Sequence, residues 1–123
     1  MKPLTKAEEQ VMLVLWKLDK GFLKDIVDTT PVPRPHPNTV ATLLKILVEK
    51  GYVEFDVQGR NNCYRPAITK TEYGKVSANQ LVKGYFEGSA AKLVSQFVSD
   101  KKLSLQELEE LLLQIRNAKK SRP

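Results

Sequence analysis

The stretch that most constrains the fold runs from residue 38 to residue 66, NTVATLLKILVEKGYVEFDVQGRNNCYRP. Its first half predicts an amphipathic helix, because apolar residues recur at i, i+3, i+4 and i+7. These residues are Val40, Leu43, Leu44 and Leu47. Gly51 is expected to end the helix, since glycine readily adopts the left-handed conformation found at helix ends. The segment therefore begins with one helix that must bury one face.

A β-hairpin is expected directly after this helix. Apolar and polar residues alternate over residues 52–57, which is the pattern of a strand with one covered face. The loop 58–62, QGRNN, is rich in turn residues and carries Arg60 and Asn61, and residues 63–67 return as the second strand. A helix followed by a hairpin with a basic tip is typical of a winged helix-turn-helix. The predicted fold class is therefore mainly α with a small β-hairpin wing.

The polar face of the predicted helix has the composition of a DNA-reading surface. At 100° per residue, Asn38, Thr42 and Lys45 fall opposite the apolar stripe. Asn can pair with adenine, a Thr methyl group can contact the thymine methyl group, and Lys can reach guanine or phosphate. The same polar residues also fit an ordinary solvent-facing surface, so the helix alone leaves both interpretations open.

The segment before this helix cannot be helical, because TTPVPRPHP over residues 29–37 contains four prolines. Pro37 suits the first helical position, where its missing N–H has no intrahelical partner. Arg34 precedes the helix at a place suited to a phosphate contact. His36 can cap the helix or touch a phosphate, although a lone histidine is more often simply a loop residue.

Helix starts elsewhere are marked by three Ser/Thr-x-x-Glu capping boxes, in which two side chains satisfy free backbone N–H groups. They are Thr5–Glu8, Thr69–Glu72 and Ser104–Glu107. The first predicts a helix that ends near residue 18 or 19, and residues 22–28 predict a short second helix. We expect a winged-helix DNA-binding domain over residues 1–70 and a helical dimerisation domain over residues 71–123.

The predicted helices of residues 71–123 have apolar faces too broad for so short a segment to bury alone. A second copy of the chain is the economical solution, and a two-fold dimer would present two recognition helices to a palindromic DNA operator. The alternative is a monomer in which these helices pack back on the N-terminal domain. The residues expected at the dimer interface are Leu81, Tyr85, Leu93, Phe97, Leu108, Leu112 and Ile115.

Composition excludes several classes of function. A net charge of +6 favours a polyanionic partner. One Cys and one His cannot form an intrachain disulfide, a Cys/His zinc site or a convincing nucleophile–base pair, and no phosphate-binding loop occurs. We therefore expect no enzyme, no metal and no cofactor. The N-terminus lacks the apolar run of a signal peptide, and the longest apolar run is too short for membrane insertion, so a cytoplasmic protein is expected.

Three stretches carry a family resemblance: LTKAEEQVMLVLW from residue 4, NTVATLLKILVEKGYVEFD from residue 38, and the strand containing Tyr64. Together with the helical tail, they resemble the penicillinase repressor family over nearly the whole chain. The resemblance implies a dimeric winged-helix repressor with an N-terminal DNA-binding domain and a C-terminal helical dimerisation domain. It places the DNA-reading positions at Asn38, Thr39, Thr42 and Lys45, with the wing near Arg60 in support.

Two departures from the family pattern concern regulation. Copper-responsive CopY-like members carry a C-terminal cysteine-rich motif, which this chain lacks, so metal sensing is not expected. In β-lactam-responsive members, a membrane receptor metalloprotease pathway leads to cleavage at an Asn-Phe bond. The matching residues here are Gln96 and Phe97, so the aromatic residue is kept and the amide side chain is one methylene longer. Phe97 also fits plain core packing.

These observations favour a homodimeric transcriptional repressor that binds a pseudo-palindromic double-stranded DNA operator and is relieved, in one version, by proteolysis. The alternative is a winged-helix module that binds protein and has no specific DNA target. Leu13 and Trp16, which lie off the buried stripe of the first helix, keep that alternative open. So do acidic residues near the expected DNA face, namely Glu49, Glu54 and Asp56.

Overall fold

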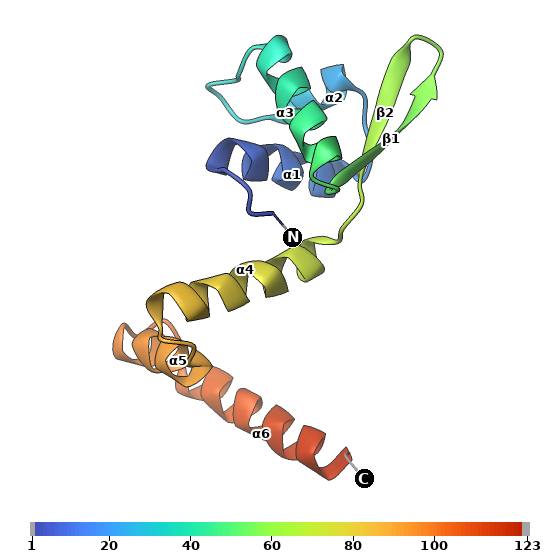
Figure 1. Cartoon of the computed structure of the whole chain (residues 1–123). Helices are drawn as coiled ribbons and strands as arrows, with labels where there is room; N and C mark the ends of the chain where they lie inside the picture. Colours follow the sequence, from blue (N-terminus) through green and yellow to red (C-terminus); the bar gives the residue numbers. More distant parts are fainter. Residues whose placement is uncertain (1, 122–123) are drawn as a thin grey trace. The chain divides into compact units, whose positions relative to one another are not determined.

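The computed structural model describes residues 2–121, with side chains described as far as residue 118. The chain forms two compact units, residues 1–75 and residues 76–123, which we describe separately. The described part is mainly helical with one β-hairpin, as the sequence predicts (Figure 1). Its elements are α1 (Lys6–Leu18), α2 (Leu23–Thr29), α3 (Pro37–Glu49), β1 (Val53–Gln58), β2 (Asn61–Pro66), α4 (Lys70–Tyr85), α5 (Ala90–Ser99) and α6 (Leu105–Ser121).

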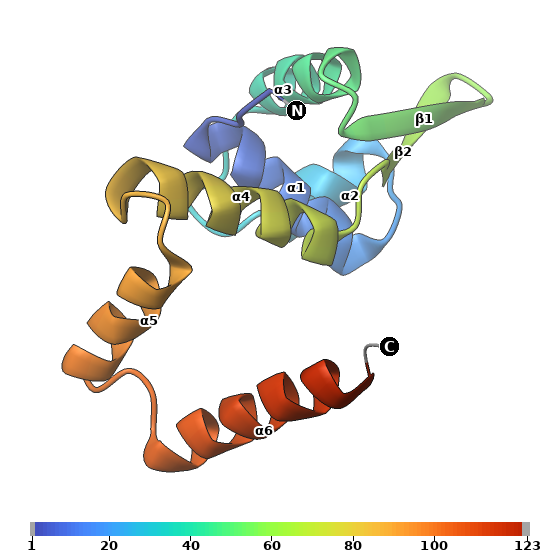
Figure 2. The same ribbon diagram turned by 60° about the horizontal axis from the view of Figure 1, so that its bottom comes forward.

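The first unit is built on α1, α2 and α3, which pack against one another and against the base of the hairpin (Figure 2). The apolar stripe of α3 lies at the centre of this core, and Val40, Leu44 and Leu47 are fully buried. Burial of each such side chain contributes about 1.5–3 kcal/mol to folding. The core also contains Val11, Met12, Val14, Leu15, Ile26, Tyr52, Val53 and Ile68.

The three capping boxes begin helices as predicted, and they close to different degrees. Ser104 and Glu107 form both expected hydrogen bonds, each of 3.1 Å. At the start of α1, the Thr5 hydroxyl accepts from the Glu8 N–H at 3.2 Å, whereas the Glu8 carboxylate turns away to Lys50. A partner distant in sequence has therefore replaced the local backbone contact of Glu8.

The hairpin pairs β1 and β2 antiparallel, with Gln58 opposite Asn61 and the turn at Gly59, whose φ is +64°. A further pair of hydrogen bonds extends it: Gly21 N–H donates to the Tyr64 carbonyl at 2.9 Å, and Tyr64 N–H donates to the Gly21 carbonyl at 2.8 Å. A bridge of one residue leaves no alternating pattern in the sequence, so sequence patterns do not reveal this contact. This bridge joins the turn after α1 to the return strand of the wing.

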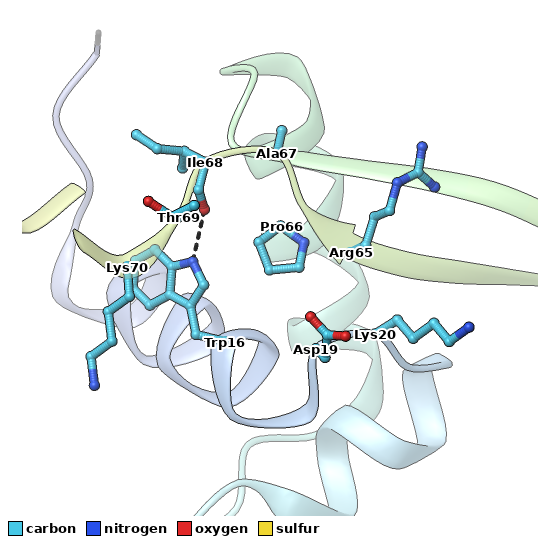
Figure 3. A pocket seen from close by; sticks show the side chains of 9 residues that line it. All are labelled: Trp16, Asp19, Lys20, Arg65, Pro66, Ala67, Ile68, Thr69 and Lys70. Carbon is cyan, nitrogen blue, oxygen red and sulfur yellow. Dashed lines mark hydrogen bonds between the residues drawn. The ribbon is translucent and has the colours of Figure 1, made fainter. Parts of the chain in front are cut away.

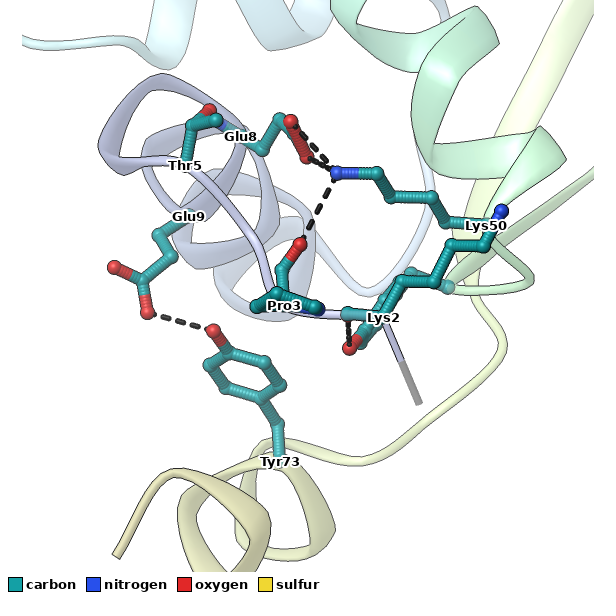
Figure 4. Close-up of polar contacts among 8 residues, drawn as sticks. Lys2, Pro3, Thr5, Glu8, Glu9, Lys50 and Tyr73 are labelled. Carbon is teal, nitrogen blue, oxygen red and sulfur yellow. Dashed lines mark hydrogen bonds and ion pairs between the residues drawn. The ribbon is translucent and has the colours of Figure 1, made fainter. Parts of the chain in front are cut away.

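The first turn of α4 belongs to the first unit. Tyr73 stacks with Trp16 at a ring-centroid distance of 5.6 Å and meets Tyr52 edge-on at 5.8 Å. The Trp16 indole N–H donates to the Ile68 carbonyl at 2.9 Å (Figure 3). The Tyr73 hydroxyl donates a 2.7 Å hydrogen bond to Glu9 (Figure 4). These contacts explain why Trp16, which lies off the stripe of α1, is nevertheless partly covered.

The second unit holds the remainder of α4 together with α5 and α6. None of its side chains described between residues 76 and 118 is buried. Several large apolar side chains are instead exposed, among them Tyr85 at 80% and Ile115 at 64%. No helix in the described part of the chain combines the length and apolar character needed to cross a bilayer.

Candidate nucleic-acid interface

Helix α3 separates its two faces sharply. The apolar face of α3 packs into the core through Val40, Leu44 and Leu47. On its other face, four polar side chains are exposed: Asn38, Thr39, Thr42 and Lys45. The structure therefore brings the four helical residues predicted to read DNA onto one surface. A recognition helix needs this arrangement, because its buried face fixes its position while its exposed face enters the major groove.

The start of α3 is fixed by local contacts. His36 is the N-cap residue, and its Nδ1 accepts a 3.0 Å hydrogen bond from the Asn38 N–H. Pro37 occupies the first helical position, as the sequence predicts. The end is set by Gly51, whose φ of +85° is strained for any residue with a side chain. Both ends of the candidate recognition helix are thus defined within the first unit.

The exposed side chains of α3 differ in how many of their hydrogen-bond donors and acceptors remain unused. The Thr42 hydroxyl donates a 3.0 Å hydrogen bond to the Asn38 carbonyl, which leaves the Thr42 methyl group and the oxygen lone pairs for a partner. The side chains of Asn38 and Lys45 make no hydrogen bond or ion pair with any group described in residues 2–121. Their amide and ammonium groups are therefore available to bases or phosphates.

Arg34, for which the sequence predicts a phosphate contact, lies in the loop before α3. It is exposed, and its Nε donates a 3.0 Å hydrogen bond to the Thr30 carbonyl. This bond holds the side chain while the terminal guanidinium nitrogens stay free of described partners. A guanidinium held in this way suits bidentate binding of a phosphate.

The wing carries its two arginines in different states. Arg60 is exposed at the tip beside Asn61, and neither side chain has a partner in the described part of the chain. Arg65, on the return strand, is bound by two carboxylates: Asp56 at 2.6 Å and Glu54 at 3.0 Å. The positive charge of the hairpin available to an anion is therefore concentrated at its tip, and the acidic residues of β1 neutralise the charge nearer its base.

A buried ion pair that no sequence pattern reveals supports the C-terminal end of α3. Lys50, the C-cap residue, donates to both Glu8 oxygens at 3.0 and 2.7 Å and to the Pro3 carbonyl at 3.1 Å (Figure 4). The side chain of Glu8 is only 5% exposed. In the sequence, Glu8 is already explained as a capping-box residue. Nothing nearby indicates that it pairs with a lysine 42 residues away.

Tyr52, directly after α3, completes this support. Its ring is buried, and its hydroxyl donates to the Lys2 carbonyl. Burial raises the pKa of the Tyr52 phenol, while the nearby Lys50 acts in the opposite direction. The N-terminal segment is thereby bound to the end of α3, which strengthens the support of this helix.

The residues predicted for dimerisation and cleavage lie in the second unit. Of the interface set, Leu93 and Leu108 are half-buried, and the other five are exposed. Gln96 and Phe97 lie within α5, where the Gln96 side chain donates a 3.1 Å hydrogen bond to Asp100. The described residues contain no group of three or more His, Cys, Asp or Glu side chains placed to hold a metal ion.

Comparison with known proteins places these features in a family. The model of the penicillinase repressor family matches residues 4–117. The penicillinase repressor of Bacillus licheniformis is 28% identical over 109 residues, covering 88% of this chain and 85% of that protein. The methicillin resistance regulatory protein MecI of Mammaliicoccus sciuri is 24% identical, covering 88% and 89%.

Two solved structures match part of this chain. A CopR repressor structure is 33% identical and has a TM-score of 0.46, covering 53% of this chain and 96% of that chain. The solution structure of monomeric Bacillus licheniformis BlaI with the blaP half-operator is 28% identical and has a TM-score of 0.48, covering 58% and 89%. The family match extends over most of the sequence, from the start of α1 into α6, and the chain therefore belongs to the penicillinase repressor family.

Proposed function

We propose that this transcriptional repressor acts as a homodimer that occupies a pseudo-palindromic double-stranded DNA operator in the cytoplasm. Helix α3 enters the major groove and reads bases with Asn38, Thr39 and Thr42, while Lys45 reaches guanine or phosphate. The observation that carries the proposal is the contrast between the two faces of α3: Val40, Leu44 and Leu47 are fully buried on one face, and four polar residues are exposed on the other. Family membership and the repressors among its relatives support the same function.

Phosphate contacts are assigned to both sides of this helix. Arg34 binds the backbone beside the N-terminus of α3, and Arg60 with Asn61 binds it from the tip of the wing. Such contacts fix the position and register of a protein on DNA, whereas contacts with base edges supply sequence choice. We assign no phosphate to Arg65, because Glu54 and Asp56 occupy its guanidinium group.

Dimerisation is assigned to the second unit, within the proposed helical domain of residues 71–123. The described side chains of residues 76–118 include none that is buried, although this unit carries Leu81, Tyr85, Phe97, Leu112 and Ile115. Exposed apolar surface of this kind is costly in water and marks a protein interface. A second copy of the unit would cover these faces and pair two winged-helix domains, here proposed as residues 1–70, over two half-sites.

Relief by proteolysis at Gln96–Phe97 is the part of the proposal that rests on family resemblance alone. The bond lies inside α5, so a protease must first unfold the helix locally to reach an extended backbone. If the proposal holds, mass spectrometry of the protein from induced cells that contain the receptor metalloprotease pathway would show fragments ending at Gln96 and beginning at Phe97. An intact chain after induction of its target genes would refute cleavage as the signal.

The decisive experiment is a salt titration of binding to DNA from upstream of the chain's own gene. Lys45→Ala and Arg60→Ala should each weaken binding and reduce the slope of log K against log salt by about one per protomer. Lys83→Ala is the matched control, because Lys83 is an exposed lysine in α4 outside the proposed DNA interface. This substitution should leave the slope unchanged. Wild-type affinity in both interface variants at matched salt would refute the site.

The second candidate is a winged-helix module that binds protein and has no specific DNA target. Leu13, which is 51% exposed on α1, favours it as an apolar contact point. Trp16 supports it less, because its indole is engaged with Ile68 and Tyr73 inside the first unit. A palindromic footprint with a steep salt slope would favour the repressor with its operator, and the absence of both would favour the protein-binding module.

A further inference from the structure

Beside the proposed DNA surface lies a side chain with a polar atom that helix capping does not use. His36 is exposed in the loop before α3 and is the single histidine of the chain. Its Nδ1 accepts from the Asn38 N–H at 3.0 Å, which satisfies one of the free N–H groups at the helix start. A serine would perform that task with fewer atoms, so the remainder of the imidazole ring is available for another contact.

The capping bond determines the protonation pattern of the ring. A nitrogen that accepts a hydrogen bond carries a lone pair, so in neutral imidazole the proton must lie on the other nitrogen. For His36, Nε2 is therefore the N–H donor. The two nitrogens point out of opposite sides of the ring, so Nε2–H is directed away from the helix backbone that Nδ1 faces. It has no partner among the described residues.

The arrangement of His36 resembles that of Arg34, to which a phosphate contact is assigned above. Arg34, two residues earlier, also uses one nitrogen to bind a backbone carbonyl and leaves its other donors free. Pro35 and Pro37 flank His36, and each restricts φ, so little conformational freedom is lost when this segment binds. Two side chains with anchored inner nitrogens and free outer donors thus lie immediately before the recognition helix.

We propose that His36 is a further DNA-contacting residue whose Nε2–H donates a hydrogen bond to a backbone phosphate beside the half-site read by α3. The contact rests on the proposed function, since it requires α3 to enter the major groove. Because the donor is neutral, it contributes position and affinity without the counterion release that accompanies a lysine or arginine contact. His36 thereby links helix capping to DNA binding. The hydrogen bond that caps α3 also fixes the tautomer in which Nε2–H can donate to the phosphate.

The test separates capping from DNA contact with two variants. His36→Ser keeps a hydroxyl that can cap the helix and removes the Nε2 donor, whereas His36→Ala removes both. On a duplex with one half-site, His36→Ser should weaken binding about three- to tenfold with an unchanged salt slope, as expected for one hydrogen bond. Equal binding by wild type and His36→Ser would overturn the inference, whether or not His36→Ala binds more weakly.

A second measurement identifies the phosphate. Methylphosphonate substitution should reveal one backbone position at which removing the charge weakens wild-type binding and leaves His36→Ser binding unchanged. Because the chain has one histidine, imidazole ¹⁵N spectra of the wild type report its tautomer directly. Nε2 should be protonated in the free protein and should shift when DNA binds. A protonated Nδ1, or an Nε2 signal unaffected by DNA, would refute the contact even if a variant failed to fold.

Failure of this inference is distinguishable from failure of the proposed function. If wild-type protein leaves no footprint on its upstream DNA, the DNA-binding proposal fails as a whole. If wild type gives a footprint and loses affinity on Lys45→Ala substitution, the α3 interface stands. Wild-type behaviour of His36→Ser in that same assay then refutes the His36 contact alone.

Discussion

Replacing Lys50 with methionine should cost the first unit about 3 kcal/mol of stability. Lys50 Nζ lies 2.7 Å from Glu8 Oε2, and the two side chains are 20% and 5% exposed. At an effective dielectric constant of about 20, the gross Coulomb attraction at that distance is about 6 kcal/mol, and desolvation of both ions offsets several kcal/mol of it. Lys50→Met leaves the Glu8 carboxylate desolvated without a counterion, and truncations of this kind cost about 3–5 kcal/mol. We take the lower limit because Lys50 keeps some contact with water.

Urea unfolding followed by tryptophan fluorescence measures this loss. Trp16 is the only tryptophan and lies in the first unit, so its signal reports the unit that contains the ion pair. With a slope of about 1.5 kcal/mol/M, the unfolding midpoint should fall by about 2 M. Protein concentration must be held constant across variants, because association with a second copy would add to apparent stability.

Two controls test the reasoning behind the magnitude. Arg65→Met breaks exposed ion pairs in the same unit, since the side chains of Arg65, Glu54 and Asp56 are 41%, 59% and 67% exposed, and it should cost less than about 1 kcal/mol. The double variant Glu8→Leu/Lys50→Met removes both charges together and should cost less than Lys50→Met alone. A loss below about 1 kcal/mol for Lys50→Met would refute the claim that burial makes this pair important. A double variant that is less stable than the single one would contradict the desolvation argument.

Three further predictions concern the core, the wing and pH. Leu44→Ala should cost about 2–5 kcal/mol in urea unfolding because Leu44 is fully buried, whereas Leu13→Ala, at a half-exposed site, should cost far less; equal losses would contradict the assigned core. Glu54→Gln/Asp56→Asn should free Arg65 and steepen the salt slope of DNA binding by about one per protomer, whereas an unchanged slope would show that Arg65 does not reach phosphate. The raised pKa of Tyr52 means that the folded state holds the phenol proton more tightly than the unfolded state. Stability should therefore fall as pH rises above the ordinary tyrosine value of about 10. In Tyr52→Phe the fall between pH 9 and 11, measured by urea unfolding, should be smaller; an identical fall would refute the assignment.

Local patterns were sufficient to predict most elements. The stripe of α3 was visible because Val40, Leu44 and Leu47 recur at the helical period, and burial of that stripe leaves Asn38 and Lys45 exposed by geometry alone. The end of α3 at Gly51 and the turn at Gly59 follow from the ease with which glycine adopts positive φ. Each of these features depends on residues close together in the chain.

Other features depend on partners distant in sequence, which leave no periodic signal. The Glu8 carboxylate follows a capping pattern in the sequence but binds Lys50 in the structure, 42 residues away. Nothing local in the sequence marks Arg65 as paired, yet the cross-strand register brings Asp56 and Glu54 within reach and neutralises its charge. Gly21 pairs with Tyr64 through a single bridge that is too short to form an alternating pattern.

The sequence by itself determined where α3 begins and ends, which of its faces is polar, and that a basic hairpin follows. These properties arise from the helical period, from proline and glycine backbone preferences, and from side-chain chemistry, all of which act over a few residues. Among the described residues, the tertiary structure decided which charged side chains pair with one another and which stay unpaired. It bound Lys50 and Arg65 to carboxylates and left Lys45 and Arg60 without described partners. The physical reason is that a charge is neutralised by whatever lies within a few ångströms of it, and only the folded chain sets those distances.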